Sequence, residues 1–210
     1  MRLFDWKAAP NPRRVRMFLA EKNIDMEIID VGEPGAPKLK DEFLNSNPHR
    51  IVPALELDDG TVIGEAPVIC RYLETVHPTP SLLGADPKEQ AAIAMWDRKC
   101  EFEGLHAVAE VLRNKAKAFA GRALPGYTIP IEQIDGLIER GTVRVGAFYA
   151  KLDHRLGEST HLATKNLSFA DITAFCVVDM AKAGKMTIPD GCANVSRWYE
   201  SVASRPSAKA

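Results

Sequence analysis

Residues 1–77 alternate between short apolar runs and longer amphipathic runs. Short apolar runs bounded by turn residues are typical of strands, whereas apolar positions three and four apart are typical of helices. The pattern predicts strands at 2–6, 26–30, 54–57 and 61–63, and helices at 12–22, 38–45 and 66–76. Between the last two strands, Asp59 and Gly60 form a strong hairpin signal. The order of these elements predicts an α/β unit with a mixed sheet.

The pattern changes after residue 77. The next segment is interrupted by turn-forming residues, namely Pro78, Pro80, Gly84 and Pro87, and such a composition is typical of a linker between domains. Beyond it, helical spacing continues at 88–120, 131–157, 170–183 and 195–204, with no convincing strand pair. We therefore expect an α/β domain at residues 1–79 and an all-helical domain at residues 86–210.

Composition narrows the functional class. The 210 residues include 27 basic and 28 acidic side chains, and the formal net charge of −1 argues against a nucleic-acid or anionic-membrane surface. Four widely spaced cysteines form no zinc-binding or disulfide pattern, so reduced thiols and no metal site are expected. The N-terminus lacks the apolar core of a secretory signal, and no apolar stretch approaches the roughly 20 residues of a membrane helix. These features predict a soluble, cytoplasmic protein.

The dipeptide Val52-Pro53 stands at the mouth of a predicted strand. Proline cannot donate a hydrogen bond to a sheet, so it belongs at an edge or at a strand start. If the Val52–Pro53 bond is cis, the backbone of Val52 turns outward, and its N–H and C=O can bind an extended peptide. The alternative is an ordinary trans proline that opens the strand.

Five segments, in this order, resemble motifs of the cytosolic glutathione transferases. They are residues 4–22 (FDWKAAPNPRRVRMFLAEK), 47–55 (NPHRIVPAL), 59–60 (DG), 64–69 (GEAPVI) and 168–172 (SFADI). The resemblance covers nearly the whole chain. It implies an α/β thioredoxin-like domain that binds glutathione, followed by an all-α helical bundle that binds an electrophilic substrate. It also implies a homodimer.

The resemblance indicates how the first domain binds glutathione. A helix that starts at Ala66 presents free N–H groups and a partial positive charge, which suit the γ-glutamyl carboxylate, and Glu65 is expected to meet the ammonium group. The family usually has serine in place of Ala66, so one hydroxyl contact is absent here. Val52 and Pro53 are expected to hold the peptide backbone.

The same resemblance suggests that Lys40 and Arg50 hold the glycyl carboxylate of glutathione. Arg50 stands where lysine is common, and its planar guanidinium offers a fork for a carboxylate. The alternative is that both are solvated loop residues.

The residue that activates the thiol is not obvious, because the nucleophile of these enzymes is the thiolate. Family members use Tyr, Ser or Cys after the first strand, but this chain has no tyrosine before Tyr72 and has Ala9 at the usual Ser or Cys position. The candidates that remain are the amide of Asn11, the charge of Arg13 and the dipole of the helix that begins near Pro12. In this respect the chain is similar to atypical fungal and bacterial members that lack all three standard residues. Polar residues of the first long helix of the second domain are further candidates: Arg113, Asn114 and Lys117.

The function that this resemblance implies is conjugation of glutathione to small hydrophobic electrophiles, as in detoxification. A related alternative is glutathione-dependent isomerisation or ether cleavage. A second alternative is a non-catalytic protein that binds glutathione or another ligand, since Ala9 and Ala66 both lack an expected hydroxyl. Ser168 and Asp171 are expected to be structural, as a capping box at the start of a helix.

Overall fold

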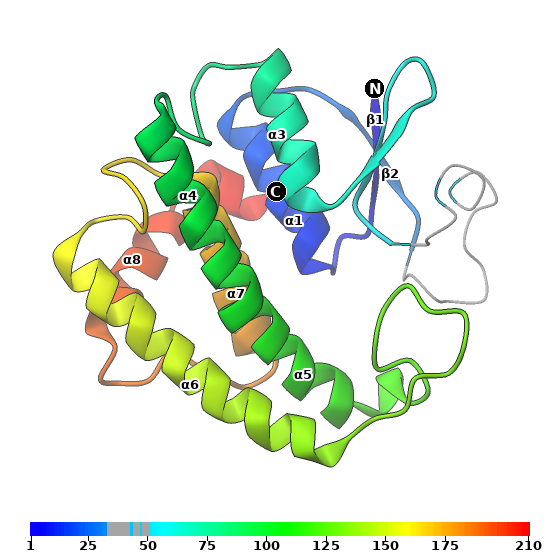
Figure 1. Cartoon of the computed structure of the whole chain (residues 1–210), viewed down its shortest axis with the longest axis vertical. Coiled ribbons are helices and arrows are strands. Elements are labelled where there is room, and N and C mark those ends of the chain that lie inside the picture. The colour runs from blue at the N-terminus through cyan, green and yellow to red at the C-terminus, as the bar shows by residue number, and fades with distance from the viewer. Residues whose placement is uncertain (33–42, 44–46, 48–50) are drawn as a thin grey trace.

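The computed structural model describes residues 1–32, 43, 47 and 51–210. A small sheet with two helices is followed by a larger helical part that packs beside it (Figure 1). The first part comprises β1 (Arg2–Asp5), α1 (Pro10–Glu21), β2 (Glu27–Asp30), β3 (Ala54–Glu56), β4 (Val62–Gly64) and α3 (Ala66–Val76). Of the predicted helix at 38–45, only Phe43 lies within the described residues, where it is helical.

The sheet is mixed, with the strand order β2-β1-β3-β4. Strands β1 and β2 are parallel, β1 and β3 are antiparallel, and β3 and β4 form an antiparallel hairpin with Leu55 opposite Ile63. The Asp59-Gly60 turn closes this hairpin, where Gly60 has a φ of +84° that glycine adopts without strain. The predicted α/β unit with a mixed sheet is confirmed.

Helices α1 and α3 bury the apolar stripes that their sequences predict, with one difference. Val15 and Phe18 of α1 and Ile69 of α3 are fully buried. Val68 and Val76, also on α3, are by contrast 52% and 44% exposed. They lie at the margins of the stripe, and only its centre is buried.

The helical part is built from a long first rod and four further helical elements. The rod consists of α4 (Pro87–Lys99), a π-helical turn (Cys100–Leu105) and α5 (His106–Lys115), followed by a 3-10 turn (Lys117–Phe119). The others are α6 (Asp135–Glu158), α7 (Phe169–Ala183), α8 (Ala193–Ala203) and a second 3-10 turn (Pro206–Lys209). No helix within the described ranges is long and apolar enough to cross a membrane.

The rod replaces the uninterrupted helix predicted at 88–120. Gly104 lies in the π-helical turn, where a Cβ atom would come within 2.7 Å of the Phe148 ring, so glycine permits close packing of α6 here. The rod ends at Lys115 because Ala116 adopts an extended conformation. The spacing of apolar residues predicts neither the π-helical turn nor the end of the rod at Lys115.

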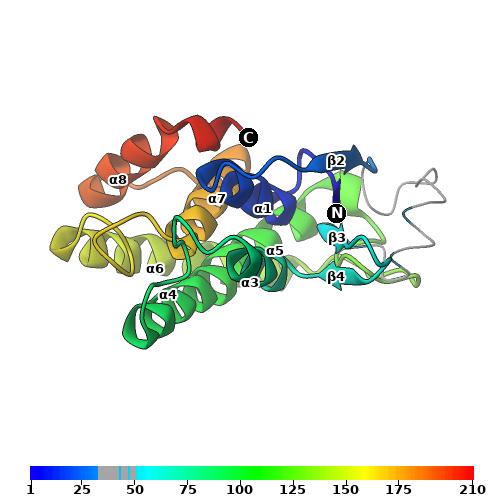
Figure 2. The ribbon, with the colours of Figure 1, turned by 90° about the horizontal axis from the view of Figure 1, so that it is seen from above.

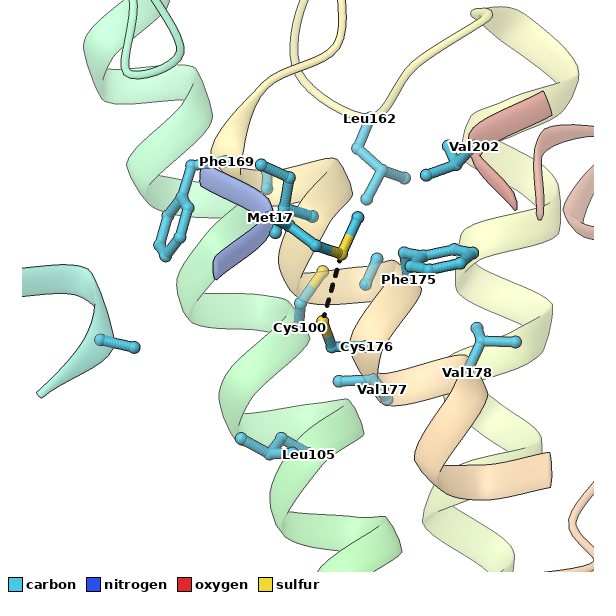
Figure 3. Packing of buried hydrophobic residues seen from close by; sticks show 14 of the residues in the cluster. Met17, Cys100, Leu105, Leu162, Phe169, Phe175, Cys176, Val177, Val178 and Val202 are labelled. Carbon is cyan, nitrogen blue, oxygen red and sulfur yellow. Dashed lines mark hydrogen bonds between the residues drawn. The ribbon is translucent and has the colours of Figure 1, made fainter. Parts of the chain in front are cut away.

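Helix α7 is the centre of the core and joins the two parts. It begins with the predicted capping box, in which Asp171 Oδ2 accepts from the backbone N–H of Ser168 at 3.0 Å. Met17 of α1 points into the same cluster as Cys100 and Cys176, and its sulfur lies 3.8 Å from that of Cys176 (Figure 3). Figure 2 shows α1 lying against α7. The helix that follows β1 is therefore held by the helical part.

Candidate active site

The first turn of α1 has a single free backbone donor. Pro10 and Pro12 have no N–H, and the N–H of Arg13 donates to the carbonyl of Ala9 at 3.3 Å. Ala9 is the N-cap and provides no side-chain cap. Within the described residues, the backbone N–H of Asn11 makes no hydrogen bond. It therefore carries the positive end of the helix dipole to any anion placed there.

The side chain of Asn11 adds further donors at the same place. Its Oδ1 accepts from Nη1 of Arg14 at 3.1 Å, whereas its Nδ2 has no partner in the part of the chain that the structure describes. Because an amide presents its oxygen and nitrogen on opposite sides, the contact with Arg14 leaves both Nδ2 hydrogens facing away from Arg14. Asn11 thus provides a backbone donor and a side-chain donor at the start of α1.

Arg14 is completely enclosed at the junction of the two parts. Its side chain is 1% exposed and donates to Thr173 Oγ1 at 3.0 Å, to Asp97 Oδ1 at 3.0 Å and to Glu101 Oε1 at 2.7 Å. Thr173 in turn donates to Asp97 at 2.6 Å. Burial lowers the pKa of Arg14, but Asp97 and Glu101 raise it by more, so the guanidinium remains charged.

Arg13 faces the helical part. Its guanidinium pairs with Asp179 of α7, donates to the carbonyl of Ala208 at 2.9 Å and lies 5.2 Å from the centre of the Phe175 ring. The positive charge of Arg13 is therefore compensated by a carboxylate of the helical part.

The Val52–Pro53 bond is cis, as the sequence motif suggested. Val52 follows Ile51 outside the strands, and among the described residues its backbone N–H and C=O make no hydrogen bond. The Val52 side chain is buried in a small apolar cluster with Phe4, and Ala9 packs on the same cluster. The free polar groups of Val52 thus lie close to the start of α1, where they can pair with an extended peptide.

The start of α3 also has a single free backbone donor. The carbonyl of Glu65 accepts from the N–H groups of Val68 and Ile69, at 3.0 and 2.9 Å, and Pro67 has no N–H. The N–H of Ala66 is left without a partner within the described ranges. Glu65 has a φ of +64°, and its exposed carboxylate forms no ion pair with any described residue.

The other predicted residues divide into two groups. Lys40 and Arg50 lie outside the described residues. Among the alternatives on α5, Asn114 is buried and ties the helix to the following loop, donating to the carbonyl of Glu110 at 2.7 Å and accepting from the N–H of Ile134 at 2.8 Å. Asn114 therefore has a structural role.

The sequence analysis did not single out Arg14 and so missed the buried network around it. Two signals were available. Arg14 precedes Phe18 by one helical turn and so lies on the apolar face of α1. Asp97 and Glu101 are also four residues apart and present two carboxylates on one face of the rod. A buried arginine needs such partners.

The fold is that of a glutathione transferase: a thioredoxin-like sheet with its helices, followed by an all-helical domain. Comparison with known proteins agrees. Residues 8–76 match the description "Glutathione S-transferase, N-terminal domain", and residues 105–206 match "Glutathione S-transferase, C-terminal domain". The chain belongs to the glutathione S-transferase family.

Individual relatives match over most of their length. The chain is 33% identical to Glutathione S-transferase 2 of Saccharomyces cerevisiae, covering 100% of this chain and 88% of that protein. A glutathione S-transferase domain-containing protein of Marinobacter aquaeolei has a TM-score of 0.88 and 32% identity, covering 99% of both chains. A Methylobacillus flagellatus glutathione S-transferase with glutathione bound has a TM-score of 0.81 over 99% of this chain and 96% of its own. Its identity is 24%, so the similarity to it concerns the fold.

Proposed function

We propose that this protein transfers the thiolate of glutathione to small hydrophobic electrophiles. The observation that carries the proposal is that α1, α3 and the Val52 edge each leave backbone polar groups unpaired in the described part of the chain. Unpaired groups of this kind, at two helix starts and at the Val52 segment of one small α/β unit, suit a short peptide with a carboxylate at one end and a thiol in the middle.

In the proposed complex, the N–H of Ala66 binds the γ-glutamyl carboxylate and Glu65 binds the adjacent ammonium group. The N–H and C=O of Val52, held by Pro53, pair with the cysteinyl backbone. Lys40 and Arg50, which lie outside the described residues, stay the predicted partners of the glycyl carboxylate. Without a serine hydroxyl beside Ala66, the carboxylate gains one hydrogen bond fewer, so we expect modest affinity.

The thiol is then directed to the start of α1. A backbone N–H and a side-chain N–H of Asn11, together with the helix dipole, favour the thiolate over the thiol. Because one unit of thiol pKa corresponds to about 1.4 kcal/mol and a hydrogen bond to a charged group contributes about 1.5–3 kcal/mol, a lowering of one to two units is expected. The positive charge of Arg13 contributes little to stabilising the thiolate, because the carboxylate of Asp179 largely offsets it.

A non-catalytic carrier is the second candidate. It is favoured by the two alanines, Ala9 and Ala66, that stand where the family has hydroxyl or thiol groups. The Asn11 amide nitrogen, which has no partner among the described residues, distinguishes the transferase from the carrier. A carrier has no need of a donor at the thiol. The homodimer and the cytoplasmic location stay predictions from the family resemblance.

Titration of glutathione bound to the protein tests the proposal. The ultraviolet absorbance of the thiolate is followed against pH, with free glutathione as the reference. A bound thiol pKa at least one unit below that of free glutathione supports the transferase. Binding with an unshifted pKa supports the carrier, and an absence of binding contradicts both.

A further inference from the structure

We propose that Arg14 is a positioning residue for thiol activation: it holds Asn11 so that the amide nitrogen, and not the amide oxygen, faces the thiol. The inference rests on the proposed function and adds a residue that does not itself touch glutathione. Its basis is the contact of Nη1 with Asn11 Oδ1 and the enclosure of Arg14 by the helical part.

The chemistry of the two groups fixes the orientation. A guanidinium has only donors, so whichever atom of the Asn11 amide faces Arg14 must be the oxygen. Both hydrogens of Nη1 have acceptors, one on Asn11 at 3.1 Å and one on Glu101 at 2.7 Å. If Asn11 rotated by half a turn, its NH₂ group would face a donor, and its oxygen would face the thiolate. Both contacts would then be repulsive.

The position of Arg14 is in turn set by groups on two helices of the other part. Thr173 of α7 accepts from Nε, Asp97 of α4 accepts from Nη2, and Glu101 accepts from Nη1. A planar guanidinium held at all three nitrogens has no freedom to turn, so its remaining contact transmits a fixed direction to Asn11.

Direct electrostatic activation of the thiol by Arg14 is a weaker explanation. Two carboxylates lie within 3.0 Å of the guanidinium and compensate its charge. Glu101 is itself shared with Arg98, so the cluster contains two arginines and two acids. Such a cluster has little net field beyond its own contacts. Arg14 is therefore expected to act through Asn11.

A double-mutant cycle tests this. The pKa of protein-bound glutathione is measured for the unmodified protein, Arg14→Lys, Asn11→Ala and the double variant. Lysine keeps the charge but cannot donate in the planar pattern, so Arg14→Lys should raise the bound thiol pKa by about one unit. In the Asn11→Ala background the same change should have no further effect, because the group through which Arg14 acts is gone.

Two further variants distinguish the positioning of Asn11 by Arg14 from a general loss of structure. Arg16 is also buried on α1 and pairs with Asp5, so Arg16→Lys is the matched control that should leave the thiol pKa unchanged. Thr173→Val removes the acceptor of Arg14 Nε and the hydrogen bond from Thr173 to Asp97, so it loosens the same network while Arg14 is kept. It should raise the thiol pKa in the same direction even if Arg14→Lys does not fold. An equal shift for Arg14→Lys with and without Asn11 would overturn the inference, as would an unchanged thiol pKa in both Arg14→Lys and Thr173→Val.

The proposed function fails separately from this inference. It fails if the unmodified protein does not lower the thiol pKa of bound glutathione. If the unmodified protein lowers it and Asn11→Ala abolishes the effect, while neither Arg14→Lys nor Thr173→Val changes it, the function stands and the role of Arg14 is wrong.

Discussion

The starts of α1 and α3 share the same backbone features but have different polar side chains. Each has proline in its first turn, each leaves one backbone N–H without a partner among the described residues, and each has an alanine, Ala9 or Ala66, where the family resemblance suggests a hydroxyl or thiol. At α1, Asn11 adds a side-chain amide whose direction is fixed by buried Arg14. At α3, the neighbouring polar side chain is Glu65, which is exposed and unpaired within the described ranges.

This difference bears on two steps: activation of the thiol at α1 and binding of the γ-glutamyl carboxylate at α3. At α1 we propose that Asn11 takes the place of the hydroxyl or thiol suggested at Ala9, so thiol activation is expected to persist. At α3 no described side chain replaces the hydroxyl missing at Ala66, so carboxylate binding rests on a single N–H. We therefore expect the activity of the protein to be limited by weak binding of glutathione more than by poor ionisation of the bound thiol.

The largest effect is expected at α3, where binding depends on few groups. Glu65→Gln keeps the shape of the side chain but loses the charge that meets the ammonium group. Since a hydrogen bond between charged groups contributes about 1.5–3 kcal/mol, the dissociation constant of glutathione should rise about tenfold or more, as measured by calorimetry. Glu200→Gln makes the same change at an exposed site on α8 and should have no effect. An unchanged dissociation constant for Glu65→Gln contradicts the assignment.

At α1 the expected effect is on rate. Asn11→Ala removes the side-chain donor, so kcat/KM with an activated aryl halide should fall about tenfold at neutral pH, which corresponds to one unit of thiol pKa. The loss should shrink as the pH rises, because bound glutathione then ionises without assistance. A loss of the same size at every pH would show that Asn11 does not act on the thiol.

A smaller gain is expected from restoring the missing hydroxyl at α3. Ala66→Ser supplies a second donor for the carboxylate, and a neutral hydrogen bond of about 0.5–1.5 kcal/mol should tighten glutathione binding by a few fold. Ala9→Ser is the paired variant: because Asn11 already serves α1, it should leave the dissociation constant unchanged. If Ala9→Ser tightens binding as much as Ala66→Ser, the two helix starts are not different in the way described here.

The smallest effect concerns the far end of α1, where Glu21 pairs with Arg205 and accepts from Ser207. Burial raises the pKa of Glu21, but these partners lower it by more, so the net shift is downward. Its contribution to stability is therefore present above the ordinary glutamate pKa and is lost as the pH falls through the lowered value. Glu21→Gln should cost on the order of 1 kcal/mol at pH 7 and nothing once Glu21 is protonated, as measured by urea unfolding. An equal cost at both pH values contradicts the ion pair.

Much of the fold was predictable because periodicity and turn chemistry are local. The hairpin, α3 and the capping box of α7 follow from a few neighbouring residues. The π-helical turn at Cys100–Leu105 does not follow from apolar spacing, and its Gly104 packs against Phe148 of α6, a residue far along the chain. The exposed Val68 and Val76 show the same limit, since spacing gives the direction of a stripe but not its width.

The candidate site divides along the same line. Val52, Glu65 and Ala66 belong to contiguous motifs and were identified from them, whereas Asn11 was one of several candidates. The buried state of Arg14 depends on Asp97 and Thr173, which lie 83 and 159 residues further along the chain. Local patterns place Arg14 on the apolar face of α1, but only the packing of α1 against α7 and α4 brings it to these partners.

The most direct test of the account is the pKa of glutathione bound to the unmodified protein and to Asn11→Ala, measured side by side by thiolate absorbance. We predict a pKa about one to two units below that of free glutathione for the unmodified protein, and a value at least one unit higher for Asn11→Ala. Equal pKa values in the two proteins would contradict the claim that Asn11, at the start of α1, replaces the missing catalytic residue.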